Sequence, residues 1–136
     1  MRTMIPLLFA LAAGAGCAKA QDDRAAEHAS AVAEVSVDQV DRMLADHTCQ
    51  PVDANGAPLR QRMGVLPGAV LLSDMDAIGE LPPDKAKPLV FYCANTACSA
   101  SHYAAEKAIA AGYTHVQVMP AGIAGWVKAG KKTQSI

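Results

Sequence analysis

The chain has 136 residues, of which 51% are apolar and 18% charged, and its formal net charge is −1. This length provides for one domain, and the composition favours a compact core over disorder. The near-neutral charge excludes the basic surface that a nucleic-acid partner requires, and four cysteines are too few for a disulfide scaffold.

An export signal is expected at residues 1–20. A basic residue precedes an apolar run at residues 4–13, which is too short to remain in a bilayer as a spanning helix. Two processing routes are open: residues 18–20 (AKA) form a secretory cleavage site, whereas residues 14–17 (GAGC) resemble a bacterial lipoprotein signal. The lipoprotein route is preferred, because Cys17 has no packing role there. Both routes predict a protein in the periplasm or cell envelope. The only membrane contact expected is the lipid on Cys17, which the lipoprotein route adds.

The folded domain is expected to cover residues 33–131. Residues 21–32 are polar and rich in alanine, which predicts a tether, and residues 132–136 are expected to form a solvated tail. Strands alternate with helices in the predicted domain, which indicates an α/β fold with a mainly parallel sheet covered on both faces. In such folds the ligand site lies at the carboxyl ends of the strands.

Short apolar runs and helical spacing define the first half of this domain. Strands are expected at residues 33–37, 49–54 and 69–72, and helices at residues 37–47 and 74–81. Ser36 and Gln39 form a capping-box pattern at the start of the first helix. Asn55-Gly56 predicts a turn after the second strand.

The stretch from Pro88 to Lys107 contains Cys93, the candidate reactive cysteine. Residues 89–92 (LVFY) have the length and composition of a buried strand, and a helix follows that Ser99 or Ser101 can cap. One face of this helix is expected to carry Tyr103, Ala104, Ile109 and Ala110. Cys93 lies between strand and helix, where the free N–H groups and positive dipole end of a helix favour a nucleophilic thiolate. The alternative for Cys93 is a buried structural cysteine.

The loop after Cys93 is expected to bind an anion through its backbone N–H groups. Its residues are small or uncharged: Ala94, Asn95, Thr96, Ala97, Cys98 and Ser99. Two roles are open for Cys98, a scaffold of the loop, which is preferred, and a resolving thiol that forms a disulfide with Cys93. The spacing C-x4-C differs from the C-x-x-C of dithiol oxidoreductases, although an oxidising compartment favours a disulfide between nearby thiols.

Two other kinds of cysteine site fit the residues poorly. A cysteine phosphatase needs a C-x5-R loop whose arginine binds the phosphate, and Ser99 occupies the position of that arginine. A metal site would have to use Cys93, Cys98 and His102, which lie too close in sequence for a closed tetrahedral site. No metal and no other cofactor is therefore expected. Cys49, at the start of a strand, is expected at the opposite end of the sheet in a structural role.

From about Val35 to Gly130 the sequence resembles a single rhodanese-like domain. The matching segments are residues 36–46 (opening helix), 52–54 (VDA), 64–69 (GVLPGA), 89–93 (strand into the active loop), 112–118 (GYTHVQV) and 122–126 (GIAGW). The resemblance implies a three-layer α/β/α fold around a mainly parallel sheet.

The same resemblance implies sulfurtransferase activity. Cys93 would take a sulfane sulfur from a small donor and pass it, as a persulfide, to a thiol or protein acceptor. Asp53 is implied as a supporting residue. The family often has an arginine where this chain has Asn55, and Arg60 or Arg62 is the candidate substitute. His102 is a candidate supporting contact because of its position in the first turn of the helix after the loop, with a solvated polar side chain as the alternative. The loop carries no Arg or Lys, which disfavours thiosulfate as the donor. The alternative function is a weakly active or inactive binding or thiol-redox-sensing module that uses Cys93 and Cys98.

Overall fold

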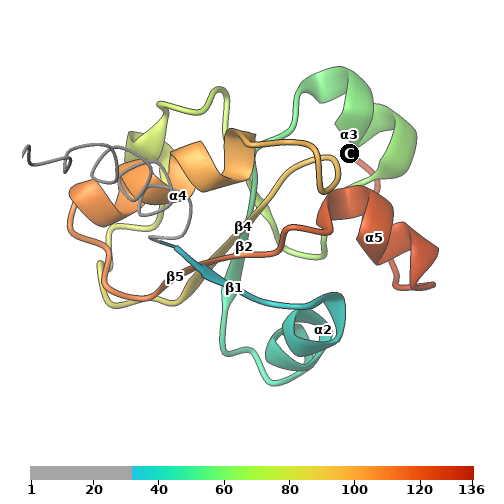
Figure 1. Cartoon of the computed structure of the whole chain (residues 1–136), viewed down its shortest axis with the longest axis horizontal. Coiled ribbons are helices and arrows are strands. Elements are labelled where there is room, and N and C mark those ends of the chain that lie inside the picture. The colour runs from blue at the N-terminus through green and yellow to red at the C-terminus, as the bar shows by residue number, and fades with distance from the viewer. Residues whose placement is uncertain (1–31) are drawn as a thin grey trace, which may run out of the picture. The chain divides into compact units, whose positions relative to one another are not determined.

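The computed structural model describes residues 32–136, so the predicted export signal, Cys17 and nearly all of the predicted tether lie outside the described part. Within it, helices lie on both faces of one five-stranded sheet (Figure 1). No helix among residues 32–136 is long and apolar enough to cross a membrane.

The strands and helices alternate along the chain. Their bounds are β1 Ala33–Glu34, α2 Val37–Ala45, β2 Gln50–Asp53, α3 Ala57–Met63, β3 Val70–Leu71, the 3-10 turn η1 Ile78–Glu80, β4 Leu89–Tyr92, α4 Ala100–Ala110, β5 Val116–Val118 and α5 Gly122–Lys128. The strand order in the sheet is β1-β5-β4-β2-β3. Every neighbouring pair runs parallel, which confirms the predicted α/β class and parallel sheet.

Each face of the sheet has its own apolar core, and β4 contributes to both. Successive side chains of a strand point to opposite faces. Leu89 and Phe91 therefore pack in the core that includes α4, whereas Val90 and Tyr92 pack with Trp126 of α5 in the core that also includes α2. Because both faces are covered, β4 is a continuous apolar run rather than an alternating one. All five of these side chains are buried, and burying one such side chain stabilises the fold by about 1.5–3 kcal/mol.

Local capping sets the start of α2 as predicted. The Ser36 hydroxyl accepts a hydrogen bond from the Gln39 amide (3.2 Å), and the Gln39 side chain accepts one from the Ser36 amide (2.8 Å). Two donors that the helix would leave unpaired are satisfied by this exchange.

Helix α3 is an element that the sequence pattern did not predict. Asn55-Gly56 indicated a turn, but Gly56 is the N-cap of α3 and Pro58 lies in its first turn, where its missing N–H costs no helical hydrogen bond. The predicted helix at residues 74–81 is reduced to the short turn η1.

The burial of α4 does not follow the face expected from its apolar side chains. In α4 the buried positions are Ser101, Ala104, Ala105 and Ala108, while Tyr103 is 41% exposed and Ile109 is 42% exposed. Residues 132–136 are exposed, and Gln134 ties this tail to the domain by exchanging backbone hydrogen bonds of 2.8 and 2.9 Å with Val65.

A buried polar network joins the ends of three neighbouring strands. Asp53, the last residue of β2, accepts hydrogen bonds from Arg60 Nε at 3.1 Å and from the Tyr92 hydroxyl at 2.6 Å. Arg60 also donates to the carbonyl oxygens of Asp53 (3.0 Å) and of Leu72, which follows β3 (2.8 Å). The Tyr92 oxygen accepts a hydrogen bond from the Leu66 amide (3.0 Å). Burial and the adjacent Asp53 carboxylate raise the pKa of Tyr92 well above its ordinary value, so its hydroxyl remains a donor.

Replacing Tyr92 by Phe should lower the free energy of unfolding by about 1–3 kcal/mol, because the change leaves a buried carboxylate oxygen and a buried amide without a partner. Urea denaturation at neutral pH, with the cysteines in one defined redox state, measures the difference. Tyr103→Phe is the matched control, since its exposed hydroxyl donates to the exposed Asp76, and it should stay within about 0.5 kcal/mol of the wild type. Equal effects of the two substitutions would show that the network does not stabilise the strand ends.

Candidate active site

Cys93 follows the last residue of β4, at the carboxyl end of a central strand. Its side chain is nearly enclosed, since the residue is 2% exposed. Two backbone hydrogen bonds fix this position from the side of α5: the Ile123 amide donates to the Cys93 carbonyl (2.9 Å), and the Ala124 amide donates to the Ala94 carbonyl (2.9 Å). The first turn of α5 therefore holds the start of the loop that follows Cys93.

Gly122 makes this close approach possible. It has a φ of +61°, and a Cβ atom at this position would lie 2.6 Å from the Cys93 carbonyl oxygen and 2.6 Å from the Ala94 carbonyl carbon. A side chain here would therefore collide with backbone that has no room to move, and its conformation would be strained as well. The segment GIAGW matched a family motif at the sequence level, but its contact with the loop follows only from the fold.

The loop folds back so that its second cysteine meets the first. The Cys98 amide donates to the Asn95 carbonyl (3.1 Å), and the Ala97 amide donates to the Asn95 side-chain oxygen (3.0 Å). Cys93 and Cys98 are joined by a disulfide, with their Cα atoms 6.3 Å apart. Of the two roles open for Cys98, the structure thus shows the disulfide partner, and the turn at Asn95 is what brings the residue into range.

A buried serine lies beside the sulfur of Cys93. Ser101 Oγ is 3.4 Å from Cys93 Sγ, and the Cys98 carbonyl oxygen is also 3.4 Å from that sulfur. Ser101 is 1% exposed, so its hydroxyl is held against the sulfur by the surrounding core. A hydroxyl in this position can donate a hydrogen bond to a thiolate or persulfide anion. The sequence pattern indicates Ser101 only as a helix cap, because its contact with Cys93 depends on the direction in which α4 leaves the loop.

The loop amides are divided between internal bonds and free donors. Those of Ala97 and Cys98 are occupied by Asn95. Within residues 32–136, no hydrogen-bond partner is found for the amides of Ala94, Asn95, Thr96 and Ser99. These four N–H groups, with the first turn of α4, are the part of the predicted anion-binding loop that can receive an anion.

The predicted supporting residues have structural partners. Asp53 and Arg60 belong to the buried network at the strand ends, and Arg60 is 8% exposed with its bonds directed to Asp53 and Leu72. Arg60 therefore holds the carboxyl ends of β2 and β3 together beside Tyr92, and its side chain is not free to bind a substrate. His102 is hydrogen-bonded through Nε2 to the Glu34 carboxylate at 3.0 Å, which ties α4 to β1.

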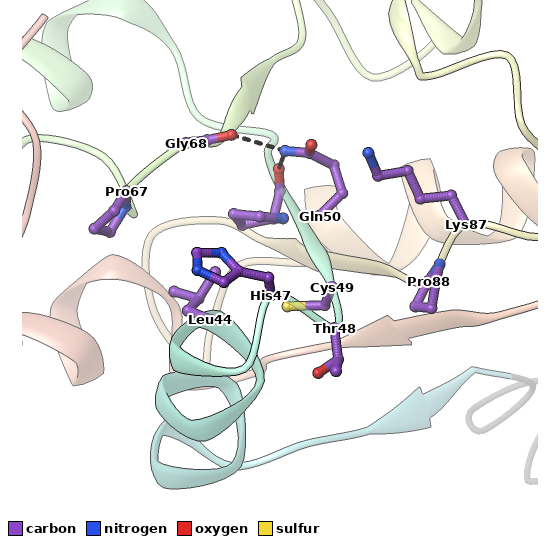
Figure 2. A pocket seen from close by; sticks show the side chains of 10 residues that line it. Leu44, His47, Thr48, Cys49, Gln50, Pro67, Gly68, Lys87 and Pro88 are labelled. Carbon is purple, nitrogen blue, oxygen red and sulfur yellow. Dashed lines mark hydrogen bonds between the residues drawn. The ribbon is translucent and has the colours of Figure 1, made fainter.

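Cys49 lies at the opposite end of the sheet, as expected. It borders a cavity of about 760 Å³ at the amino ends of β2 and β4 (Figure 2). Other residues of its lining include Leu44, His47, Gln50, Lys87 and Pro88. Burial raises the pKa of the Cys49 thiol to about 11, so at neutral pH it stays protonated and weakly nucleophilic. Cys49 is thus an internal control for chemistry at Cys93.

Comparison with known proteins shows what the chain resembles. Residues 36–129 match the family model for the rhodanese-like domain, while no curated protein matches the sequence. A human single-domain sulfurtransferase is 19% identical, with 70% of this chain and 95% of that chain covered and a TM-score of 0.60. A thiosulfate sulfurtransferase from Pseudomonas aeruginosa is 20% identical, with 82% of this chain but 21% of that chain covered and a TM-score of 0.67.

A third similar structure has no assigned activity. It is a protein of unknown function from Rhodopseudomonas palustris, described as a possible tyrosine phosphatase, with 20% identity, 89% of this chain and 100% of that chain covered, and a TM-score of 0.68. At these identities the three structures establish the shared fold and leave the chemistry to the residues of this chain.

Replacing Gly122 by Ala should lower the free energy of unfolding by roughly 2–5 kcal/mol, as the sum of a left-handed backbone cost and a collision with the Cys93 loop. Gly130→Ala is the matched control: Gly130 also has a positive φ (+75°), but no atom lies within 4 Å of the position that a Cβ would take there. It should cost only the backbone term, roughly 1–2 kcal/mol. Chemical denaturation measures both, and a Gly122→Ala protein as stable as Gly130→Ala would refute the close approach.

Proposed function

The chain belongs to the rhodanese-like domain family, and on that basis we propose that it is a sulfurtransferase that carries sulfane sulfur as a persulfide on Cys93. The observation that supports this most is the position of Cys93. Its sulfur lies at the carboxyl end of β4, 3.4 Å from the buried hydroxyl of Ser101 and at the start of a loop with free amides.

The proposed transfer has two steps. The Cys93 thiolate attacks the outer sulfur of a donor, the sulfur–sulfur bond of the donor breaks, and the donor leaves as a thiolate. Cys93 then holds the sulfur as a persulfide anion, which Ser101 and the loop amides can stabilise by hydrogen bonds. An acceptor thiolate attacks the outer sulfur, and Cys93 leaves as a thiolate ready for another cycle. The reaction requires Cys93 in its reduced form, so the disulfide with Cys98 is an inactive state for this chemistry.

The lack of cationic side chains on the loop favours one class of sulfur donor. The segment from Ala94 to Ser99 carries no cationic side chain, and Arg60 is bound to Asp53 and Leu72. A dianion such as thiosulfate would find no cationic side chain on the loop. A singly charged donor, such as the persulfide of a small thiol, needs only the hydrogen-bond donors that are present.

The disulfide supports a second candidate function, a thiol-redox-sensing module that keeps the fold without turnover. In that case the reversible bond between Cys93 and Cys98 is the functional event. The two candidates differ in one measurable property, since only the sulfurtransferase gains a sulfur atom.

Sulfur loading tests the proposal. The reduced full chain is incubated without oxygen with small persulfides or with thiosulfate, alkylated, digested with trypsin and examined by mass spectrometry. Residues 86–107 form one tryptic peptide that contains Cys93 and Cys98 but neither Cys17 nor Cys49. With a persulfide donor, chains whose Cys98 is replaced by Ser should gain the mass of one sulfur atom on this peptide, and thiosulfate should load them poorly.

The controls locate the sulfur. Adding Cys93→Ser should abolish the gain, whereas adding Cys49→Ser should leave it unchanged, because Cys49 lies at the other end of the sheet. If no donor adds sulfur to Cys93 in a folded protein, the redox-sensing function is the better account.

We also propose that the protein is exported and is anchored by a lipid on Cys17. The apolar run and the GAGC segment support this, and a disulfide is typical of proteins in oxidising compartments. In a bacterial host with lipoprotein processing, the mature chain should begin at a lipid-modified Cys17 and partition into membranes, and Cys17→Ala should release it. A mature protein that begins at Gln21 without lipid would contradict the anchor, and one that retains residues 1–20 would contradict export.

A further inference from the structure

The two cysteines of the active loop differ in their access to solvent. Cys93 is buried, with its sulfur between Ser101 Oγ and the Cys98 carbonyl oxygen. Cys98 is only partly buried and lies in the turn at Asn95, where its neighbours Thr96, Ala97 and Ser99 are exposed. A reagent from solution thus reaches the sulfur of Cys98 more readily than that of Cys93.

The structure also shows which sulfur Cys98 can reach. The disulfide joins the two Sγ atoms directly, so the turn brings Cys98 Sγ to the sulfur that would be the inner atom of a Cys93 persulfide. The hydrogen bonds from the Ala97 and Cys98 amides to Asn95 hold this turn. Attack at the inner sulfur of a persulfide expels the outer sulfur as hydrosulfide.

We propose that Cys98 resolves the Cys93 persulfide and that the domain thereby reduces sulfane sulfur to hydrosulfide. This inference rests on the proposed sulfur loading of Cys93. In the resolving step the Cys98 thiol gives its proton to the outer sulfur of the persulfide, and the Cys98 thiolate attacks Cys93 Sγ. The bond between Cys93 Sγ and the outer sulfur breaks, and the outer sulfur leaves with the bonding electron pair and this proton as hydrosulfide. The two cysteines lose two electrons to the sulfur atom and become the disulfide that the structure shows.

A dithiol reductant completes the cycle. One of its thiolates attacks the more accessible Cys98 Sγ, and Cys93 leaves as a thiolate stabilised by Ser101. The second thiol of the reductant then displaces Cys98, so the reductant becomes a disulfide and both cysteines of the loop are thiols again. The partner is thus a protein or small-molecule dithiol, and the acceptor of the sulfur is Cys98 itself, with no external monothiol required.

Single-turnover experiments without oxygen test this step. The fully reduced full chain, freed of reductant, is mixed with one equivalent of a small-molecule persulfide, and the protein is then separated from the small molecules. Hydrosulfide is assayed in the small-molecule fraction, and the mass of peptide 86–107 is measured in the protein fraction. The wild type and Cys49→Ser should each release one hydrosulfide per chain, and their peptide should become two hydrogens lighter than the dithiol form. A sample kept without donor should remain a dithiol. Cys98→Ser and Cys98→Ala should keep the added sulfur on Cys93 and release hydrosulfide only after a thiol is added.

The outcomes separate this inference from the proposed function. If the wild type retains the sulfur on Cys93 as the Cys98 variants do, or if the sulfur is found on Cys98, the resolving role is wrong while sulfur loading stands. If neither the wild type nor the folded Cys98 variants take up sulfur from any donor, the proposed function fails, and the resolving role fails with it. A second addition of donor after treatment with a protein dithiol should release a further hydrosulfide per wild-type chain, whereas without the dithiol no further release is expected.

Discussion

The alignment of the strand ends beside Cys93 depends on one buried carboxylate, that of Asp53. Asp53 at the end of β2 binds Arg60 from α3 and the hydroxyl of Tyr92 from β4, and Arg60 extends the network to Leu72 after β3. Removing one member of a buried ion pair typically costs about 3–5 kcal/mol, because the other charge is left without a partner. Tyr92 immediately precedes Cys93, so the network that aligns three strand ends also fixes the point from which the active loop starts. The hydrogen bonds from Ile123 and Ala124 fix the loop from the other side.

The local chemistry of the chain could be predicted, and its long-range contacts could not. The capping box at Ser36 and the buried strand before Cys93 follow from neighbouring residues, and both are found where expected. Helix α3 was not predicted because Asn55-Gly56 is typical of turns, although a glycine can also cap a helix. The buried face of α4 was not predicted, because it consists of Ala and Ser, which carry little periodic signal beside Tyr103 and Ile109. Ser101 and Gly122 act through contacts with Cys93, which no local pattern indicates.

The disulfide in the structure and the persulfide that we propose place different demands on the same residues. As a thiolate or persulfide, Cys93 needs hydrogen-bond donors without a fixed cation, and Ser101 with the free amides of the loop meets this need. As a disulfide, it needs Cys98 within bonding distance, and the turn at Asn95 provides that. The loop has no cationic side chain to bind an oxyanion tightly, so sulfur exchange among thiols suits it better than chemistry on a highly charged donor. Burial of Cys93 leaves Cys98 as the more accessible sulfur for a reductant.

A crystal structure of the reduced Cys98→Ser protein, treated with a small-molecule persulfide without oxygen, tests the central claim most directly. We expect one additional sulfur atom bonded to Cys93 Sγ, within the loop from Ala94 to Ser99 and within hydrogen-bond reach of its free amides or of Ser101. The network around Asp53 should be unchanged. An intact loop with unmodified Cys93, or an added sulfur on Cys49 instead, would contradict the assignment of Cys93 as the sulfur carrier.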